Sequence, residues 1–463
     1  MLKSVRRLAV LSSHVQNVNR NMCSSGATAT SVRAPTMSVN PKFCLVDEKI
    51  KIRLTGLASN QIVTFVADVR ENGSVFESRC VYRADDSGVV DNCTSESLDG
   101  TFKGVEQMGL FWSLKSVGAR VAMRLVKKDV TRPMEFTIRV FDGNQAEAPE
   151  ISSDPLSETV VHRTFMAPDV KRLPLREGRF RGTVFLPKGP GPFPGLIDMF
   201  GGLVSQVETR AALLASHGYA TLSLAYMYAE GLPQEVAHVN IDYIREAFEW
   251  FSGLEYIDAS RLGAVGLCFG GFLSLGLTSI LPQIKAVVNI NGTCITLGEN
   301  TTELENEWLR TDHTDKIEVT TEGIVIRDIF DSDNAVCVPA WQHGAKILVV
   351  VGEDDKQVHP KWHTYFQDNI PVQFKDNLQV IRYPDTGHLI EPPHMPFIRA
   401  IDAGGKRMLT INFIPKQFKD QKLMSGGHMV AHSHAQEDAW QRILDFLHTH
   451  LGPGMAVKTP ACF

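Results

Sequence analysis

A glycine-flanked cysteine is the part of this 463-residue sequence best suited to chemistry. The motif Gly266-Leu267-Cys268-Phe269-Gly270-Gly271 follows the apolar run Leu262–Val265 and precedes an apolar helical stretch, Phe272–Ile280. This strand–turn–helix order is typical of a nucleophile elbow, in which small residues two positions before and after the nucleophile relieve a strained turn. A helix N-terminus activates a thiol, and the N–H of Phe269 can bind a developing oxyanion. The alternative is a buried structural cysteine, because an isolated G-x-C-x-G is a weak signal.

Two later strand ends carry the side chains that such a nucleophile needs. The segment Val349–Asp355 is a buried run ending in carboxylates, and Tyr383–His388 leads from a strand to a loop histidine. The order nucleophile, acid, histidine is that of α/β-hydrolases. We therefore expect His388 to accept the thiol proton and Asp355 to orient the imidazole and stabilise its charged form. The neighbouring Asp354 is the alternative acid, which we interpret as a structural turn carboxylate.

A second oxyanion donor is expected in the loop Met199–Gly202, after the first strand of the same domain. Small residues there allow the backbone to approach the nucleophile closely. The N–H of Gly201 or Gly202 is therefore predicted to join that of Phe269.

Three histidines near the C-terminus, His428, His432 and His434, raise the possibility of a metal site. No carboxylate with ligand spacing accompanies them, and they precede the pattern of the final helix. We interpret them as a solvated helix entry and predict no metal.

The elements that must position the candidate residues fall into two parts. The first shows short β segments with turn punctuation and no helical period, which favours an Ig-like β-sandwich. Its expected strands are Lys49–Leu57, Gln61–Val69, Val75–Tyr82, Met134–Phe141 and Glu158–Phe165, with a hairpin turn at Glu71-Asn72-Gly73. The second part alternates strands with helices, which predicts an α/β fold with a mostly parallel sheet covered on both faces. Its expected strands are Gly195–Phe200, Ala220–Ala225, Leu262–Leu267, Ala286–Ile290, Ile347–Val351 and Leu378–Tyr383, and its helices are Ala211–His217, Asn240–Gly253, Phe272–Ile280 and Glu437–Leu451.

A chain of this length exceeds one ordinary core, so we expect two domains plus ends. The predicted division is a leader over 1–36, a sandwich over 38–165, a catalytic α/β-hydrolase domain over 175–453 and a tail over 454–463. A proline-rich linker is expected over Ala148–Glu177. The region Leu297–Val338 breaks the strand–helix rhythm and is predicted to be an insertion that forms a lid or a substrate-facing segment.

The leader contains Lys and Arg but no acidic residue before Asp47, which is typical of a mitochondrial presequence and indicates the matrix. A disordered leader is the alternative, and a start at Met37 predicts a cytoplasmic product. The net charge of −5 gives no basic footprint for nucleic acid, and no apolar run is long enough to cross a bilayer. Eight scattered cysteines indicate neither a zinc site nor a disulfide scaffold. We expect a monomer or a weak homo-oligomer.

The sequence resembles the family of acyl-CoA thioesterases and bile acid-CoA:amino acid N-acyltransferase from about residue 40 to 452. The resembling segments are Met108–Trp112, Arg124–Val130, Gly191–Gly201, Leu224–Tyr226, Asn289–Gly292 and Tyr383–Pro393. The resemblance implies an Ig-like domain followed by an α/β-hydrolase domain, and it places nucleophile, acid and histidine at Cys268, Asp355 and His388. The family's thioesterases usually carry serine as nucleophile and its N-acyltransferase branch carries cysteine, so this chain departs from the thioesterase pattern.

Four functions compete on this basis. The first is hydrolysis of long-chain fatty acyl-CoA through an acyl-enzyme, with CoA as part of the substrate and no cofactor. The second is acyl transfer from acyl-CoA to an amino acid such as glycine or taurine. The third is a cysteine-dependent hydrolase of another ester or lactone, since dienelactone hydrolases also carry a G-x-C-x-G-G elbow. The fourth is a catalytically silent binding protein.

Overall fold

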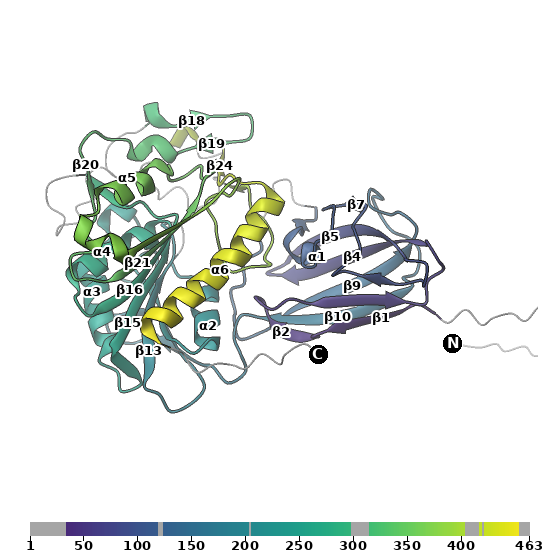
Figure 1. The fold of residues 1–463 in the computed structure, drawn as a ribbon, viewed down its shortest axis with the longest axis horizontal. Helices are drawn as coiled ribbons and strands as arrows, with labels where there is room; N and C mark the ends of the chain where they lie inside the picture. The colour runs from purple at the N-terminus through teal and green to yellow at the C-terminus, as the bar shows by residue number, and fades with distance from the viewer. Residues whose placement is uncertain are drawn as a thin grey trace, which may run out of the picture.

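The computed structural model of the chain describes residues 34–118, 124–202, 205–297, 314–402, 416–418 and 421–452. Most of the predicted leader and the whole predicted tail therefore lie outside the described residues. An all-strand N-terminal part and a larger part of strands and helices lie side by side (Figure 1).

The N-terminal part is a sandwich of two sheets. Its elements are β1 (Thr36–Asn40), β2 (Phe43–Leu45), β3 (Lys51–Thr55), β4 (Ile62–Glu71), β5 (Ser74–Arg83), β6 (Val90–Asp91), β7 (Asp99–Gly100), α1 (Gly109–Trp112), β8 (Lys115–Ser116), β9 (Met134–Asp142) and β10 (Ser157–Thr164). The smaller sheet has the order β1-β3-β6 and the larger β2-β10-β9-β4-β5-β7. The chain changes sheets between β1 and β2, and β2 then runs parallel to β10. This is the Ig-like arrangement that the sequence predicted.

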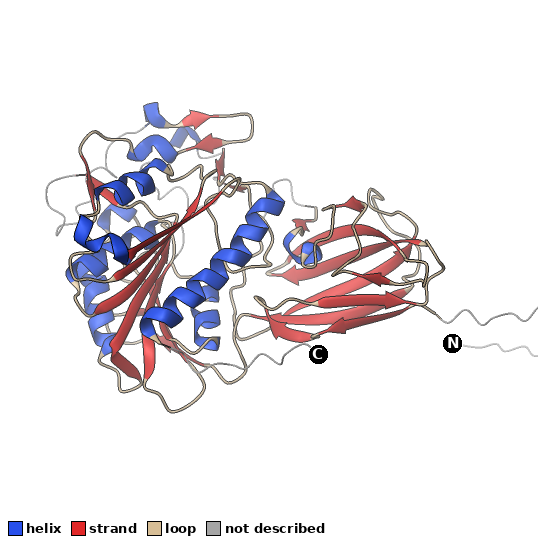
Figure 2. Ribbon diagram, in the orientation of Figure 1, coloured by secondary structure: helices blue, strands red, loops and turns tan. Residues whose placement is uncertain are grey.

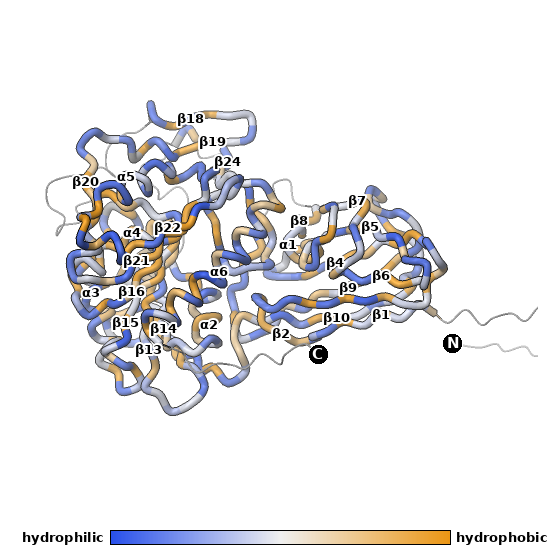
Figure 3. Tube along the Cα trace, in the orientation of Figure 1, coloured by the Kyte–Doolittle hydropathy of each residue, from blue (hydrophilic) through white to orange (hydrophobic). Residues whose placement is uncertain are grey.

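An eight-stranded sheet forms the centre of the C-terminal part. Its strands are β11 (Lys171–Leu175), β12 (Arg181–Leu186), β13 (Phe193–Met199), β14 (Ala220–Ala225), β15 (Ile257–Leu267), β16 (Ile284–Ile290), β21 (Lys346–Gly352) and β22 (Leu378–Tyr383). The order is β11-β12-β14-β13-β15-β16-β21-β22. The pairings of β12 are antiparallel and all later ones are parallel. Strands β13, β14, β16 and β21 are almost wholly buried and carry mostly apolar residues, as strands covered on both faces do (Figure 3). The mostly parallel sheet of the predicted α/β fold is therefore confirmed.

Helices cover both faces of this sheet (Figure 2). They are α2 (Thr209–Ser216), α3 (Ile241–Ser252), α4 (Phe269–Ile280), α5 (Lys361–Asn369) and α6 (Met429–Leu451). Apolar residues of α3 and α4 share one core cluster with one face of the sheet. Apolar residues of α2 and α6 belong to a second cluster that continues into the sandwich. The sandwich therefore packs against the α2/α6 side.

The predicted insertion over Leu297–Val338 contributes to two small sheets. They contain β17 (Ile295–Leu297), β18 (Glu318–Val319), β19 (Ile324–Val325), β20 (Ala335–Cys337), β23 (Ala400–Asp402) and β24 (Lys422–Met424). Their orders are β17-β20 and β18-β19-β24-β23. Short 3-10 turns lie at η1 (Val236–His238), η3 (Thr314–Lys316), η4 (Arg327–Phe330), η5 (Val372–Asn377) and η7 (Lys416–Phe418). Residues 298–313 of the insertion lie outside the described part.

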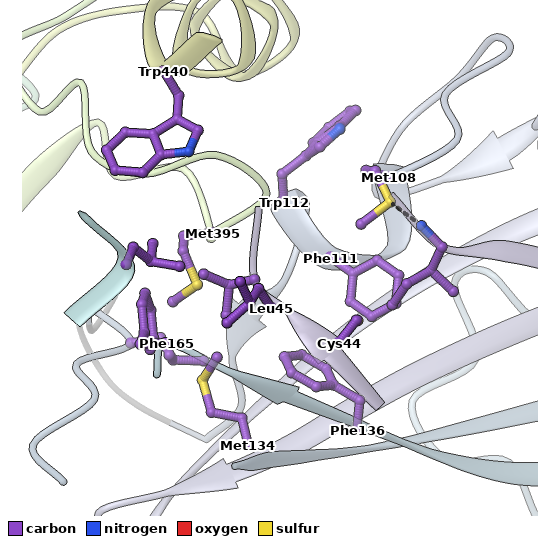
Figure 4. Packing of buried hydrophobic residues seen from close by; sticks show 14 of the residues in the cluster. Cys44, Leu45, Met108, Phe111, Trp112, Met134, Phe136, Phe165, Met395 and Trp440 are labelled. Atoms are coloured by element: carbon purple, nitrogen blue, oxygen red, sulfur yellow. Dashed lines mark hydrogen bonds between the residues drawn. The ribbon is translucent and has the colours of Figure 1, made fainter. Parts of the chain in front are cut away.

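The sandwich and the hydrolase part share buried apolar side chains. Met395 and Trp440 of the hydrolase part lie in one cluster with Leu45 and Phe165 of the sandwich (Figure 4). The expected linker over Ala148–Glu177 is wrong, because β10 and β11 both lie within it and only six residues separate them. Its prolines include Pro174, which lies on the edge strand β11, where a missing N–H donor is tolerated.

Candidate active site

Cys268 occupies a strained turn between β15 and α4. Its φ of 59° and ψ of −128° lie in a region that L-residues rarely adopt. Its N–H donates to the carbonyl oxygen of Ile290 over 2.9 Å, which ties the turn to β16. The helix begins at Phe269, directly after the cysteine, so the predicted start at Phe272 is wrong.

The glycines around Cys268 are required by close backbone contacts. A Cβ at Gly266 would lie 2.1 Å from the carbonyl oxygen of Gly270. A Cβ at Gly270 would lie 2.3 Å from the carbonyl oxygen of Met199 on β13. Glycine here lets the helix pack against the strand end and does not interrupt the helix.

His388 and Asp355 form a buried pair beyond the ends of β22 and β21. His388 Nδ1 lies 2.7 Å from Asp355 Oδ2, and each side chain is 1% exposed. The second carboxylate oxygen accepts from the backbone N–H groups of Gln357 (2.7 Å) and Val358 (3.0 Å). These bonds fix the carboxylate, so that Nδ1 carries the proton and Nε2 is free for chemistry.

The free nitrogen of His388 belongs to the same site as the thiol. Nε2 is buried and has no hydrogen bond of good geometry within the described residues. Burial by itself lowers the pKa of His388, but the charges of Asp355 and then Cys268 outweigh it and raise the pKa to about 10. The structure thus brings together the three residues that the sequence predicted, in an arrangement suited to proton transfer from the thiol.

Asp354, the alternative acid, points to a different partner. Its Oδ2 accepts from the N–H of Gly427 over 2.8 Å, and Lys356 Nζ lies 2.6 Å from Oδ1. Its contacts therefore hold the acid turn against the segment that precedes α6.

The loop that carries His388 is held by two side chains that sequence reasoning did not assign to the site. His432 Nδ1 accepts from the N–H of Gly387 (3.1 Å), and Nε2 donates to the carbonyl of Leu389 (2.9 Å). Asn291 donates to the carbonyls of Gly387 (3.1 Å) and His388 (2.8 Å) and accepts from the end of β21. The backbone on both sides of the histidine is therefore fixed.

The interpretation of the C-terminal histidines as a solvated helix entry is wrong for His432, which is 1% exposed. Burial lowers its pKa to about 4, so it is neutral and can accept at one nitrogen while donating at the other. His434 is exposed and lies 2.9 Å from Glu106 of the sandwich. The helix period offered one signal, because His432 falls on the face of α6 that also buries Ala435 and Ala439.

The predicted oxyanion loop lies against the nucleophile. A Cβ at Gly201 would lie 3.2 Å from Cys268 Cβ and 3.4 Å from its sulfur. A Cβ at Gly202 would lie 3.7 Å from that of Phe269. As the first residue of α4, Phe269 has no acceptor within the helix for its N–H. The turn at Gly201 and Gly202 and the N–H of Phe269 therefore lie beside Cys268, as the predicted oxyanion site requires.

Two tyrosines fix the oxyanion loop from behind. Tyr226 is buried, and its hydroxyl donates to the carbonyls of Phe200 and Gly201. The hydroxyl of Tyr228 donates to the carbonyl of Gly202 over 3.1 Å. Because the carbonyls are held on that side, the N–H groups can face the site.

Other sequence features lie apart from this chemistry. Within the described part of the chain, no group of three or more His, Cys, Asp or Glu side chains is arranged to hold a metal ion. Among the helices described, none is long and apolar enough to cross a membrane.

Comparison with known families gives two matches. The family described as the acyl-CoA thioester hydrolase/BAAT N-terminal region matches residues 47–177. The one described as the BAAT/acyl-CoA thioester hydrolase C terminal matches residues 239–453.

Individual relatives come from both branches that these descriptions name. Mouse acyl-coenzyme A thioesterase 3 is 34% identical over 90% of this chain and 95% of its own. Human bile acid-CoA:amino acid N-acyltransferase is 35% identical over 90% and 98%. Human acyl-coenzyme A thioesterase 2, mitochondrial, is 35% identical over 90% and 85%. Similarity of this kind extends across both parts of the fold.

Proposed function

Because the chain belongs to the family of acyl-CoA thioester hydrolases and bile acid-CoA:amino acid N-acyltransferases, we propose that it hydrolyses long-chain fatty acyl-CoA to fatty acid and CoA. The observation that carries the proposal is the site geometry. A cysteine at a positive-φ turn lies beside a buried histidine whose other nitrogen is 2.7 Å from a carboxylate. The roles of Cys268, His388 and Asp355 follow from that arrangement.

The reaction proceeds in two halves. The thiol proton of Cys268 passes to His388, whose raised pKa favours the charged imidazole, and the Cys268 thiolate then attacks the thioester carbonyl. The oxyanion is bound by the N–H of Phe269 with that of Gly201 or Gly202. The C–S bond to CoA breaks, and His388 returns its proton to the CoA sulfur. Water then attacks the acyl-enzyme with His388 as base, which releases the fatty acid and regenerates the thiol.

Acyl transfer to an amino acid is the second candidate, and the nucleophile itself favours it. With Cys268, the acyl-enzyme is a thioester, so its formation from acyl-CoA exchanges one thioester for another. Thioesters react readily with amines when the amine is held in position. A bound glycine or taurine would then take the place of water in the second half.

Product analysis separates the two candidates. Purified protein is given palmitoyl-CoA with and without excess glycine or taurine. We expect palmitate and free CoA in both cases, and loss of turnover in Cys268→Ala. N-acyl amino acid formed at the expense of palmitate would make the protein a transferase, and full turnover in Cys268→Ala would refute both candidates.

A mitochondrial matrix location is also proposed. Its support is the acid-free, basic composition of residues 1–36 together with a relative named as mitochondrial. The test is import of a reporter fused to those residues, and a reporter that remains in the cytosol overturns it.

A further inference from the structure

A pocket of about 370 Å³ lies between the sandwich and the hydrolase part. Three short segments line it. One is the basic segment Arg124–Lys128 of the sandwich, one is Ser205–Thr209 beyond the oxyanion loop, and one lies beyond His388 and contains Glu391 and Met395. Continuations of two of the loops that build the active site therefore form walls of this interdomain pocket.

Arg124 connects the pocket to both of these loops. Its guanidinium lies over the ring of Phe200, 5.3 Å from the centroid, and it forms an ion pair with Glu391. Phe200 directly precedes Gly201, at which an added Cβ would lie 3.2 Å from Cys268 Cβ. Glu391 follows His388 by three residues. A side chain of the sandwich thus bridges the oxyanion loop and the histidine loop.

Most charges around the pocket are neutralised by fixed partners. Glu208 is bound by two nitrogens of Arg172, each at 2.7 Å. Lys127 is paired with Glu71 at 2.9 Å. The remaining charges on the lining are the Arg124–Glu391 pair and Lys128, which is exposed. The net charge of Arg124, Glu391 and Lys128 is positive, and the positive charge on the lining increases if Glu391 moves away.

We propose that the interdomain pocket receives an anionic group of a substrate, which replaces Glu391 as the partner of Arg124 while Lys128 adds to the attraction. This inference rests on the proposed function and assigns the sandwich a part in substrate binding. Arg is suited to the role because its planar guanidinium binds carboxylate, sulfonate and phosphate oxygens alike.

Two groups of the proposed reaction have this chemistry. One is a phosphate of CoA, and the other is the carboxylate or sulfonate of an amino acid acceptor. Acyl-CoA must approach the Cys268 sulfur, and an amino acid the Cys268 thioester, from outside the buried site. The Glu391 carboxylate, which pairs with Arg124 in the free protein, is the internal competitor of either group.

The test compares palmitoyl-CoA with S-palmitoyl-pantetheine, which has the same thioester and no phosphate. The variants are Arg124→Gln, Arg124→Lys and Lys128→Gln, with Arg132→Gln as the control on an exposed sandwich surface. If the pocket binds phosphate, Arg124→Gln raises KM for palmitoyl-CoA at least tenfold and leaves KM for the pantetheine thioester within twofold. Arg124→Lys recovers part of the loss, and Lys128→Gln gives a two- to fivefold change of the same selectivity.

The other arm measures N-acyl product against glycine or taurine concentration. A tenfold rise in KM for the amino acid, with KM for palmitoyl-CoA unchanged, identifies the acceptor as the anion. An equal fall in kcat on all substrates, or no change, overturns the inference, because a purely structural clamp does not discriminate between substrates. Turnover of S-palmitoyl-pantetheine by the unaltered protein tests the proposed chemistry separately, since that substrate does not need the anion site.

Discussion

The cysteine turn and the histidine loop meet in one site, but the chain holds them in different ways. Backbone contacts hold Cys268, since Gly266 and Gly270 allow the end of β15 and the start of α4 to touch, Gly270 allows α4 to lie against the end of β13, and the N–H of Cys268 donates to Ile290. His388 is held by Asn291, which directly follows β16, and by His432 on α6, which are 97 and 44 residues away along the chain. Close packing of main-chain atoms fixes one position, and hydrogen bonds from distant side chains fix the other.

This difference teaches where the site is sensitive. Backbone contacts fix the nucleophile, so we expect substitutions that add atoms there to be harmful. Hydrogen bonds fix the histidine loop, so we expect substitutions that remove a donor or an acceptor there to be harmful. The acid turn stands between the two cases, because Asp355 is held by the nearby N–H groups of Gln357 and Val358 while its other oxygen binds His388.

The largest effect is expected from the acid. In Asp355→Asn an amide replaces the carboxylate that fixes the Nδ1–H tautomer, so kcat should fall about 10³–10⁴-fold. The matched control is Asp354→Asn, which loses bonds to Gly427 and Lys356 but none to His388, and we expect kcat within about threefold. Steady-state kinetics of the two variants checks the assignment. The reverse ranking would show that the neighbouring carboxylate orients the histidine.

The next prediction tests the backbone packing around Cys268. Gly270→Ala places a methyl group against the carbonyls of Met199 and Phe200, so the backbone must shift, and the free energy of unfolding should fall by about 3 kcal/mol. The control is Gly253→Ala at the end of α3, where the nearest atom is an ordinary contact at 3.5 Å. That change should stay within about 0.5 kcal/mol. Urea denaturation measures both, and equal stabilities would contradict the role of backbone packing.

A prediction with a smaller expected effect tests the hydrogen bonds that hold the loop of His388. His432→Phe fills the volume but leaves the N–H of Gly387 without its acceptor and removes one of the donors to the carbonyl of Leu389. A loosened His388 should lower kcat by about 10–100-fold with KM within about twofold. His432→Gln, which can accept and donate, should recover part of the loss, whereas His434→Gln on the exposed side of α6 should change little. An unchanged kcat in His432→Phe would show that the loop holds its shape without these bonds.

The sequence could predict those features that are set by patterns within a few residues. Such patterns predicted the cysteine turn, the acid turn and the strands Ala220–Ala225 and Leu378–Tyr383. The observed β14 and β22 have these bounds. The predicted hairpin turn has φ of 50° at Asn72 and 81° at Gly73, as its sequence requires.

What the sequence did not reveal depends on partners that are distant along the chain or on weak local patterns. Strand β11 is short and lies within the proline-containing stretch that suggested a linker, and the six-residue strand β12 follows that stretch. Tyr226 and His432 have roles set by carbonyls and N–H groups of loops 25 and 45 residues away. No periodicity identifies such a pair, because its members need only meet in the folded protein.

The last prediction concerns pH and compares two histidines that are equally buried. The pKa of His432 is lowered to about 4, so between pH 6.5 and 4 the unfolded chain binds a proton that the folded chain does not. Folding stability should therefore fall with decreasing pH in this window, by about 2 kcal/mol from this histidine between pH 7 and 5. His363 and His394, with pKa values lowered by burial to about 4 and about 3, act in the same direction.

His388 has the opposite sign, because its pKa is raised to about 10. Its contribution to stability is nearly complete below about pH 6.5 and is lost as the pH rises toward 10, so in the acid window it adds only a smaller slope of the opposite sign. Urea denaturation at pH 7, 6 and 5 should therefore give a shallower pH dependence for His432→Gln than for the unaltered protein. If the two proteins show the same pH dependence, His432 binds its proton while its side chain stays against the histidine loop. The loop would then depend less on the hydrogen bond from Gly387 to His432 than the geometry indicates.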